Sequence, residues 1–101
     1  MKFATFALFK FIRGRGEDGR KFLDAQFVLL KKQPGLVHGF ISQGAGDPDS
    51  FFIFTEWKDE DSHKQMIQKL RELLSGGTEY MSLMPILAAM PVMESYKIVK
   101  E

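Results

Sequence analysis

The sequence contains no cysteine, and this absence excludes disulfides, thiolate catalysis and thiolate metal sites. It is compatible with a reducing cytoplasm, where we expect the protein to reside. The chain also lacks a basic excess that could hold a phosphate backbone, because 14 basic and 13 acidic residues leave a net charge of +1. No apolar run approaches the roughly 18 residues that a membrane span requires. Neither nucleic acid nor a membrane is therefore an expected partner.

Recognisable catalytic and metal-binding motifs are scarce as well. The two histidines, His38 and His63, have no metal-ligand spacing, so we expect no metal site. The loop at 13–19 is rich in glycine but lacks the Gly-Lys-Ser/Thr end of a phosphate-binding loop. Neither a Ser-His-Asp triad nor a pair of catalytic carboxylates can be argued from the spacing. The sequence indicates no bound cofactor.

Apolar residues make up 45% of the 101 residues, which is enough for one hydrophobic core. We therefore expect a single domain over residues 1–101. The first twelve residues resemble a short signal peptide, but Lys10 interrupts their apolar core and no small-residue cleavage site follows. A β-strand over 3–12 explains the same pattern, and both of its faces are largely apolar.

Hydrophobic periodicity and turn residues divide the rest of the chain. A helix is predicted over 18–33, because apolar residues recur on one arc and Pro34–Gly35 stops the pattern. A second helix is predicted to begin at Asp59 as N-cap and to end at Gly76–Gly77. Strands are predicted over 36–43, 51–57 and 92–99, with short helical pieces within 78–90.

The predicted order, β-α-β-β-α-β, is typical of the ferredoxin-like α+β fold. In this fold an antiparallel sheet with strand order 4-1-3-2 carries both helices on one face. The two central strands are then the first and the third, which are the two that are apolar on both faces. Local pattern and topology agree.

The second and third strands are predicted to form a hairpin across the turn at 44–50. If the turn is centred near Asp47, the numbers of cross-strand partners sum to about 94. Phe40 then faces Phe54, Ile41 faces Ile53, and His38 faces Glu56. In this register the carboxylate would favour the charged imidazole and fix its orientation.

The sheet face away from the helices is expected to carry several Phe, Leu and Ile side chains. Each stabilises the protein by roughly 1.5–3 kcal/mol when buried. Such a patch exceeds what monomers commonly expose. We therefore predict a homodimer that packs sheet against sheet about a two-fold axis.

Several stretches of the chain resemble the antibiotic biosynthesis monooxygenase (ABM) family. They are Pro34–Gly35 at the start of the second strand, Glu56–Trp57 at the end of the third, the acidic turn to Asp61, and Leu83–Pro91 before the last strand. The resemblance covers roughly residues 3–99 and implies a dimeric α+β barrel. The family includes cofactor-independent oxygenases of phenolic polycyclic substrates, haem-degrading enzymes and proteins with other roles.

The chain also departs from patterns that the resemblance implies. Family members often carry a histidine nine residues after the tryptophan of the third strand, where this chain has Met66. The haem-degrading branch has a second tryptophan in the following helix and a histidine beyond it, but here Trp57 is alone and no histidine follows His63. The oxygenase branch uses Trp, Tyr, Asn and Arg groups, and this chain has no asparagine, so that set cannot transfer whole.

The two histidines are the candidate catalytic residues. His63 could be a general base or hydrogen-bond donor at the mouth of a pocket, or a first-turn histidine satisfied by the backbone or by Asp59. His38 could act with Glu56, or the two could form a structural pair at the edge of the sheet.

Trp57, Glu56, Tyr80 and Gln26 are the candidate substrate-binding residues. Trp57 matches the family tryptophan and either orients an aromatic substrate or covers the core. Tyr80 lies in the segment after the second helix and could help to orient the ring. Gln26 falls within the apolar arc of the first helix, where it either lines a pocket or bonds to the backbone.

Three functions stay open. The first is a cofactor-independent monooxygenase with a small phenolic or quinol-like substrate in a pocket between helices and sheet. His63 or His38 would deprotonate the substrate, and its carbanion would react with dioxygen. The second is a non-catalytic dimeric module that binds a small apolar or aromatic molecule. The third is haem binding or degradation, which the missing residues disfavour.

Overall fold

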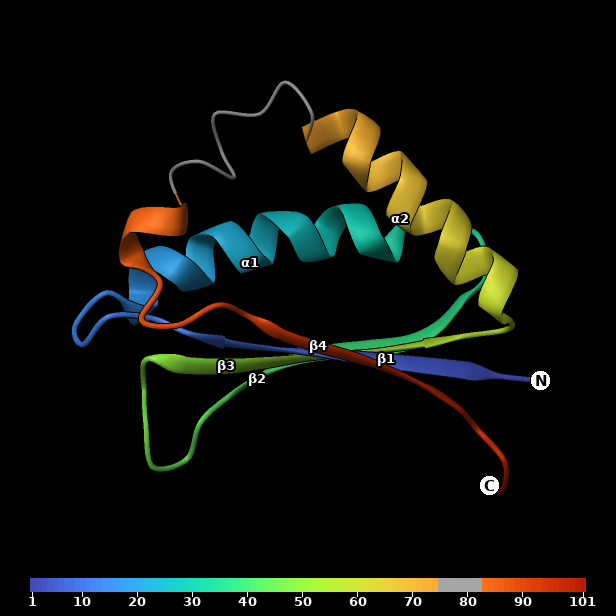
Figure 1. The fold of residues 1–101 in the computed structure, drawn as a ribbon, viewed down its shortest axis with the longest axis horizontal. Coiled ribbons are helices and arrows are strands. Elements are labelled where there is room, and N and C mark those ends of the chain that lie inside the picture. The colour runs from blue at the N-terminus through green and yellow to red at the C-terminus, as the bar shows by residue number, and fades with distance from the viewer. Residues whose placement is uncertain (75–82) are drawn as a thin grey trace.

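A four-stranded antiparallel sheet carries both long helices on one face (Figure 1). The computed structural model describes residues 1–74 and 83–101, with side chains for 1–69 and 83–101. The elements are β1 (Phe3–Lys10), α1 (Gly16–Lys31), β2 (Leu36–Gln43), β3 (Ser50–Trp57), α2 (Glu60–Leu74), the 3-10 helix η1 (Met84–Ile86) and β4 (Val92–Lys97). The sheet order β2-β3-β1-β4 is the predicted 4-1-3-2 read from the other edge. The ferredoxin-like fold is confirmed.

Several boundaries differ from the predicted ones. Helix α1 begins and ends two residues earlier than the periodicity suggests. Strand β1 ends at Lys10, because Phe11 leaves the ladder and makes an isolated bridge with Leu87. Strand β4 ends at Lys97, and only the bond from Ile98 N to Lys2 O continues the pairing. The predicted helix end at Gly76–Gly77 lies outside the described residues.

The loop before α1 is fixed by Asp49, which precedes β3. Its carboxylate accepts hydrogen bonds from the backbone N–H groups of Gly14 (3.0 Å) and Gly16 (2.9 Å). Phe11 N also donates to the carbonyl of Asp49, at 2.9 Å. A carboxylate here satisfies N–H groups that a helix start leaves without partners, and it suits the positive end of the helix dipole. This contact explains why α1 starts at Gly16 rather than at the predicted Asp18.

The register of the β2–β3 hairpin is the predicted one. Phe40 pairs with Phe54, Ile41 with Ile53, and His38 with Glu56. A bulge between Leu36 and His38 adds one residue at the start of β2. The registers of β1 and β4 with their neighbours follow the same two-residue period, so each strand residue can be assigned to a face.

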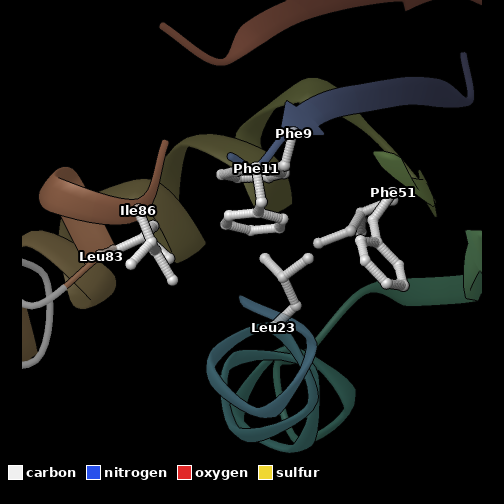
Figure 2. Packing of buried hydrophobic residues seen from close by; sticks show 7 residues of the cluster. Phe9, Phe11, Leu23, Phe51, Leu83 and Ile86 are labelled. Carbon is white, nitrogen blue, oxygen red and sulfur yellow. The ribbon is translucent and has the colours of Figure 1, made fainter. Parts of the chain in front are cut away.

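The core lies between the sheet and the helices. Its larger cluster joins the sheet, α1 and η1, with Leu23 of α1 beside Phe11 and near Phe51 (Figure 2). Leu83 and Ile86 close the same cluster at one end. A second cluster, around Trp57, contains Phe3, Leu30 and Met66. Phe27 packs against both clusters and so connects them.

The opposite face of the sheet, which we call the open face, is rich in apolar rings. The Phe6 ring stacks on Phe52 and Tyr96, with centroids 5.1 and 5.7 Å apart, and Phe40 stacks on Phe54 at 5.2 Å. Phe40 and Tyr96 are 41% and 51% exposed, whereas the other three rings are half-buried by one another. No helix lies over this face in the described part of the chain (Figure 1). The prediction that both faces of the central strands are apolar is confirmed.

Candidate functional site

A short polar chain crosses the helix-facing side of the sheet. Trp57 is completely buried, and its indole N–H donates to the hydroxyl of Thr55 at 3.0 Å. That hydroxyl lies 2.7 Å from the hydroxyl of Thr5 on the adjacent strand. These hydrogen bonds satisfy the polar groups that Trp57 and Thr55 bring into an apolar layer. The indole is therefore held in one orientation. This supports a structural role for Trp57.

The start of α2 is fixed next to Trp57. Asp59 acts as the predicted N-cap, since its carboxylate accepts a hydrogen bond from Ser62 N at 2.8 Å. Hydrogen bonding from the backbone N–H of Ser62 and, second, from its side chain lowers the pKa of Asp59. Gly35 has a positive φ of 88°, and a Cβ there would collide with Ser62. A glycine at this position thus lets the turn into β2 approach the first turn of α2 closely.

This packing places His63 over two aromatic side chains. Its ring centroid lies 5.2 Å from that of Phe3 and 5.8 Å from that of Trp57, with the indole in an edge-on arrangement. The side chain is half-buried, and loss of solvation lowers the pKa of His63, while the Glu60 carboxylate raises it by a smaller amount. Burial disfavours the imidazolium, so the neutral form of His63 predominates at pH 7. A neutral imidazole can accept a proton.

His38 and Glu56 lie on the open face, because the two-residue alternation of β2 and β3 places them on the same side as Phe40 and Phe54 and on the opposite side from Trp57. The predicted cross-strand pairing of the two residues is confirmed. Their side chains form no ion pair, however, among the described residues. The sheet separates them from His63, so the six candidate residues do not form one helix-side pocket.

The remaining candidates are not gathered near His63 either. Gln26 is half-buried on α1 and lines neither of the two clefts described below. Tyr80 lies outside the described residues. On the helix side of the sheet, Trp57 and His63 are thus the two candidate residues that the structure brings together.

Two clefts adjoin the helix side of the sheet. The Phe3 cleft, of about 310 Å³, is lined by Met1, Phe3, Asp59, Glu60, Asp61 and Lys97. Its lining residue Phe3 is also the ring that His63 contacts, although His63 itself is not part of the lining. The α1 cleft, of about 330 Å³, is lined by Arg20, Asp24, Phe27, Ile41, Ser42, Gln43 and Phe51. Both volumes are at the lower end of the range for small-molecule sites. Within the described ranges, no group of three or more His, Asp or Glu side chains is close enough to hold a metal ion.

Sequence reasoning missed the polar chain and the α1 cleft. The alternation along β1 and β3 already places Thr5 and Thr55 on the same face as Trp57, so these polar contacts could have been predicted from the sequence. The sequence indicates the α1 cleft more weakly, through the spacing of Arg20 and Asp24 on one face of a helix. That spacing alone does not say which strand lies opposite.

No protein-family model matches the sequence, and no curated protein matches it. Solved structures do resemble it. SnoaB, a cofactor-independent oxygenase from Streptomyces nogalater, superimposes with a TM-score of 0.79 at 12% identity, covering 99% of this chain and 95% of SnoaB. A candidate antibiotic biosynthesis monooxygenase from Nitrosomonas europaea gives 0.76 at 15% identity, over 97% of this chain and 90% of that one.

A third structure, named as a candidate antibiotic biosynthesis monooxygenase from Chloroflexus aurantiacus, has a TM-score of 0.71 at 17% identity. The superposition covers all of this chain and 96% of the other chain. At these identities the similarity establishes the fold, and function has to be argued from the site. No helix in the described part of the chain is long and apolar enough to cross a membrane.

Proposed function

We propose that this chain, which has the fold of the antibiotic biosynthesis monooxygenase structures, is a cofactor-independent oxygenase of a small phenolic or quinol-like molecule. The observation that carries the proposal is the half-buried, predominantly neutral imidazole of His63, which lies against Trp57 and against Phe3, a lining residue of the Phe3 cleft. The oxygenase activity named for SnoaB, which shares the fold, supports the same reaction class.

In the proposed reaction the substrate occupies the Phe3 cleft with its hydroxyl toward His63. The imidazole accepts the hydroxyl proton, and the resulting electron-rich ring carbon reacts directly with dioxygen. Loss of water from the peroxide gives a quinone, so that phenol and dioxygen become quinone and water with atoms and electrons balanced. Phe3 contributes an aromatic wall, and the Lys97 ammonium in the cleft lining would stabilise the phenolate.

We further propose that the active species is a homodimer in which two open faces pack together. The support is the set of rings on that face, which two helices on the far side leave uncovered (Figure 1). A face this apolar is stabilised by burial against a matching face. This arrangement leaves the Phe3 cleft on the helix side, away from the dimer contact.

Dioxygen uptake with a panel of catechols, hydroquinones and polycyclic phenols tests the proposed activity. His63→Ala should abolish the uptake seen with the unchanged protein, whereas Lys64→Ala, at an exposed position next to it, should retain it. His38→Ala distinguishes the two catalytic candidates. It should retain dioxygen uptake, because His38 lies on the open face and the proposed reaction takes place on the helix side. Loss of uptake in His38→Ala with activity intact in His63→Ala would place the site on the open face and contradict the proposal.

A non-catalytic binding module is the second candidate. It is favoured by the complete burial of Trp57, which removes the indole face from any ligand, and by the absence of both histidines from the lining of the two described clefts. This function predicts that aromatic ligands raise the melting temperature without consumption of dioxygen. Turnover of any panel member would exclude it.

A further inference from the structure

The α1 cleft lies at the edge of the sheet, between α1 and the β2–β3 hairpin, and its apolar surface is aromatic and branched. Phe51 is almost fully buried and belongs to the larger core cluster, whereas Phe27 and Ile41 are half-buried and partly available to a ligand. The ring of Phe27 lies against β2, because a Cβ at Gly39 would be 3.4 Å from it. Phe27 and Ile41 offer contact to one apolar group of modest size.

The charged rim of the cleft carries one group of each sign. Arg20 Nε lies 3.7 Å from the carboxylate of Asp24, which is too long for a hydrogen bond. Both side chains are about half exposed, at 51% and 56%, so their attraction is weak. The guanidinium and the carboxylate therefore keep hydrogen-bonding capacity for a ligand. Gln43 donates its amide N–H to Pro48 O at 2.9 Å, which fixes a third polar side chain at the rim.

We propose that the α1 cleft is a binding site for an apolar α-amino acid. The guanidinium of Arg20 would pair with the α-carboxylate, a planar match that arginine makes through two parallel hydrogen bonds. The Asp24 carboxylate would accept from the α-ammonium, and the side chain would rest on Phe27 and Ile41. A ligand with both charges suits this rim, because an anion alone would be repelled by Asp24 and a cation alone by Arg20.

The size of the cleft agrees with this class of ligand. About 330 Å³ accommodates a molecule such as leucine or phenylalanine. The site shares no lining residue with the Phe3 cleft and has no histidine. Its occupation can therefore be measured without dioxygen, and its failure would leave the proposed oxygenase activity untouched.

Isothermal titration with L-leucine and L-phenylalanine tests the site directly. We expect saturable binding of both, and at least about tenfold weaker binding of phenylpropionate and phenethylamine, which each lack one charged group. Glycine, which lacks the apolar group, should give no measurable heat. Amide chemical shifts on titration should change at Phe27, Ile41 and Gln43.

Arg20→Gln and Asp24→Asn should each weaken binding of L-phenylalanine about tenfold, because each removes one charged partner. Arg15→Gln and Asp18→Asn are matched controls, since this exposed pair at the start of α1 lies outside the cleft. The thermal melt of every variant should be close to that of the unchanged protein. Absence of amino-acid binding, equal binding of phenylpropionate, or equal weakening by the control variants would overturn the proposal.

Discussion

At the scale of single residues, burial of His63 has an energetic consequence as well as a chemical one. Contact with the rings of Phe3 and Trp57 removes water from the imidazole and disfavours its charged form. The same desolvation that keeps the imidazole ready to accept a proton makes its protonation unfavourable for the folded state. Activity and stability should therefore respond together to acid.

Because the pKa of His63 is lowered in the folded protein from its ordinary 6.5, the unfolded chain binds the proton more readily at mildly acidic pH. The free energy of unfolding should thus fall as the pH decreases from about 7.5 through 6.5, and level off below the folded-state pKa. Urea denaturation at a series of pH values measures this. The His63→Phe variant should lose that part of the pH dependence, and an unchanged slope in the variant would contradict the assignment.

The hydroxyl of Thr55 should stabilise the fold through Trp57. Thr55→Val leaves the buried indole N–H without its acceptor, which should cost about 1–3 kcal/mol in the free energy of unfolding. Adding Trp57→Phe removes the orphaned donor, so the double variant should be more stable than the sum of the single effects indicates. Chemical denaturation of the three variants gives the coupling, and strict additivity would show that the bond contributes nothing.

At the scale of elements, hydrophobic alternation and turn chemistry predicted the strands, their order and the hairpin register. The register could be predicted because a slip by one residue would turn Phe51, Ile53 and Trp57 away from the helices. The start of α1 could not, since it depends on Asp49, which is 33 residues away from Gly16 in the sequence. Local propensity does not include such a contact.

The composition of the candidate site was less predictable than the fold. Periodicity places His38 and Glu56 opposite each other but does not say which face the helices cover. The helix face is decided by the side on which both crossovers pass, and this is a property of the whole chain. For that reason the sequence could not show that the candidate catalytic residues His38 and His63 lie on opposite faces of the sheet.

The contact between α1 and the end of β1 depends on Gly19. A Cβ at this position would collide with the ring of Phe11, which is itself buried in the larger core cluster. Gly19→Ala gains helix propensity of about 1 kcal/mol, but overpacking costs about 1–3 kcal/mol. We therefore expect a net loss of stability in thermal or urea denaturation. Gly46→Ala is the control, because nothing lies within 4 Å of its Cβ, and equal effects of the two variants would contradict this packing.

At the scale of the whole molecule, the two faces of the sheet differ in what covers them. One side holds the core, His63 and both clefts, and the other presents stacked rings with no helix over them in the described part of the chain (Figure 1). We propose that the open face is buried against a second copy in the dimer. Ligands would then bind on the helix side alone.

Sedimentation equilibrium at micromolar concentration tests this division most directly. We expect a dimer for the unchanged protein, and a monomer for Phe52→Glu, which places a charge in the centre of the open face. Val28→Glu, an equally drastic change at an exposed apolar position on α1, should remain a dimer. A clean monomer of the unchanged protein, or dissociation by Val28→Glu but not by Phe52→Glu, would contradict it.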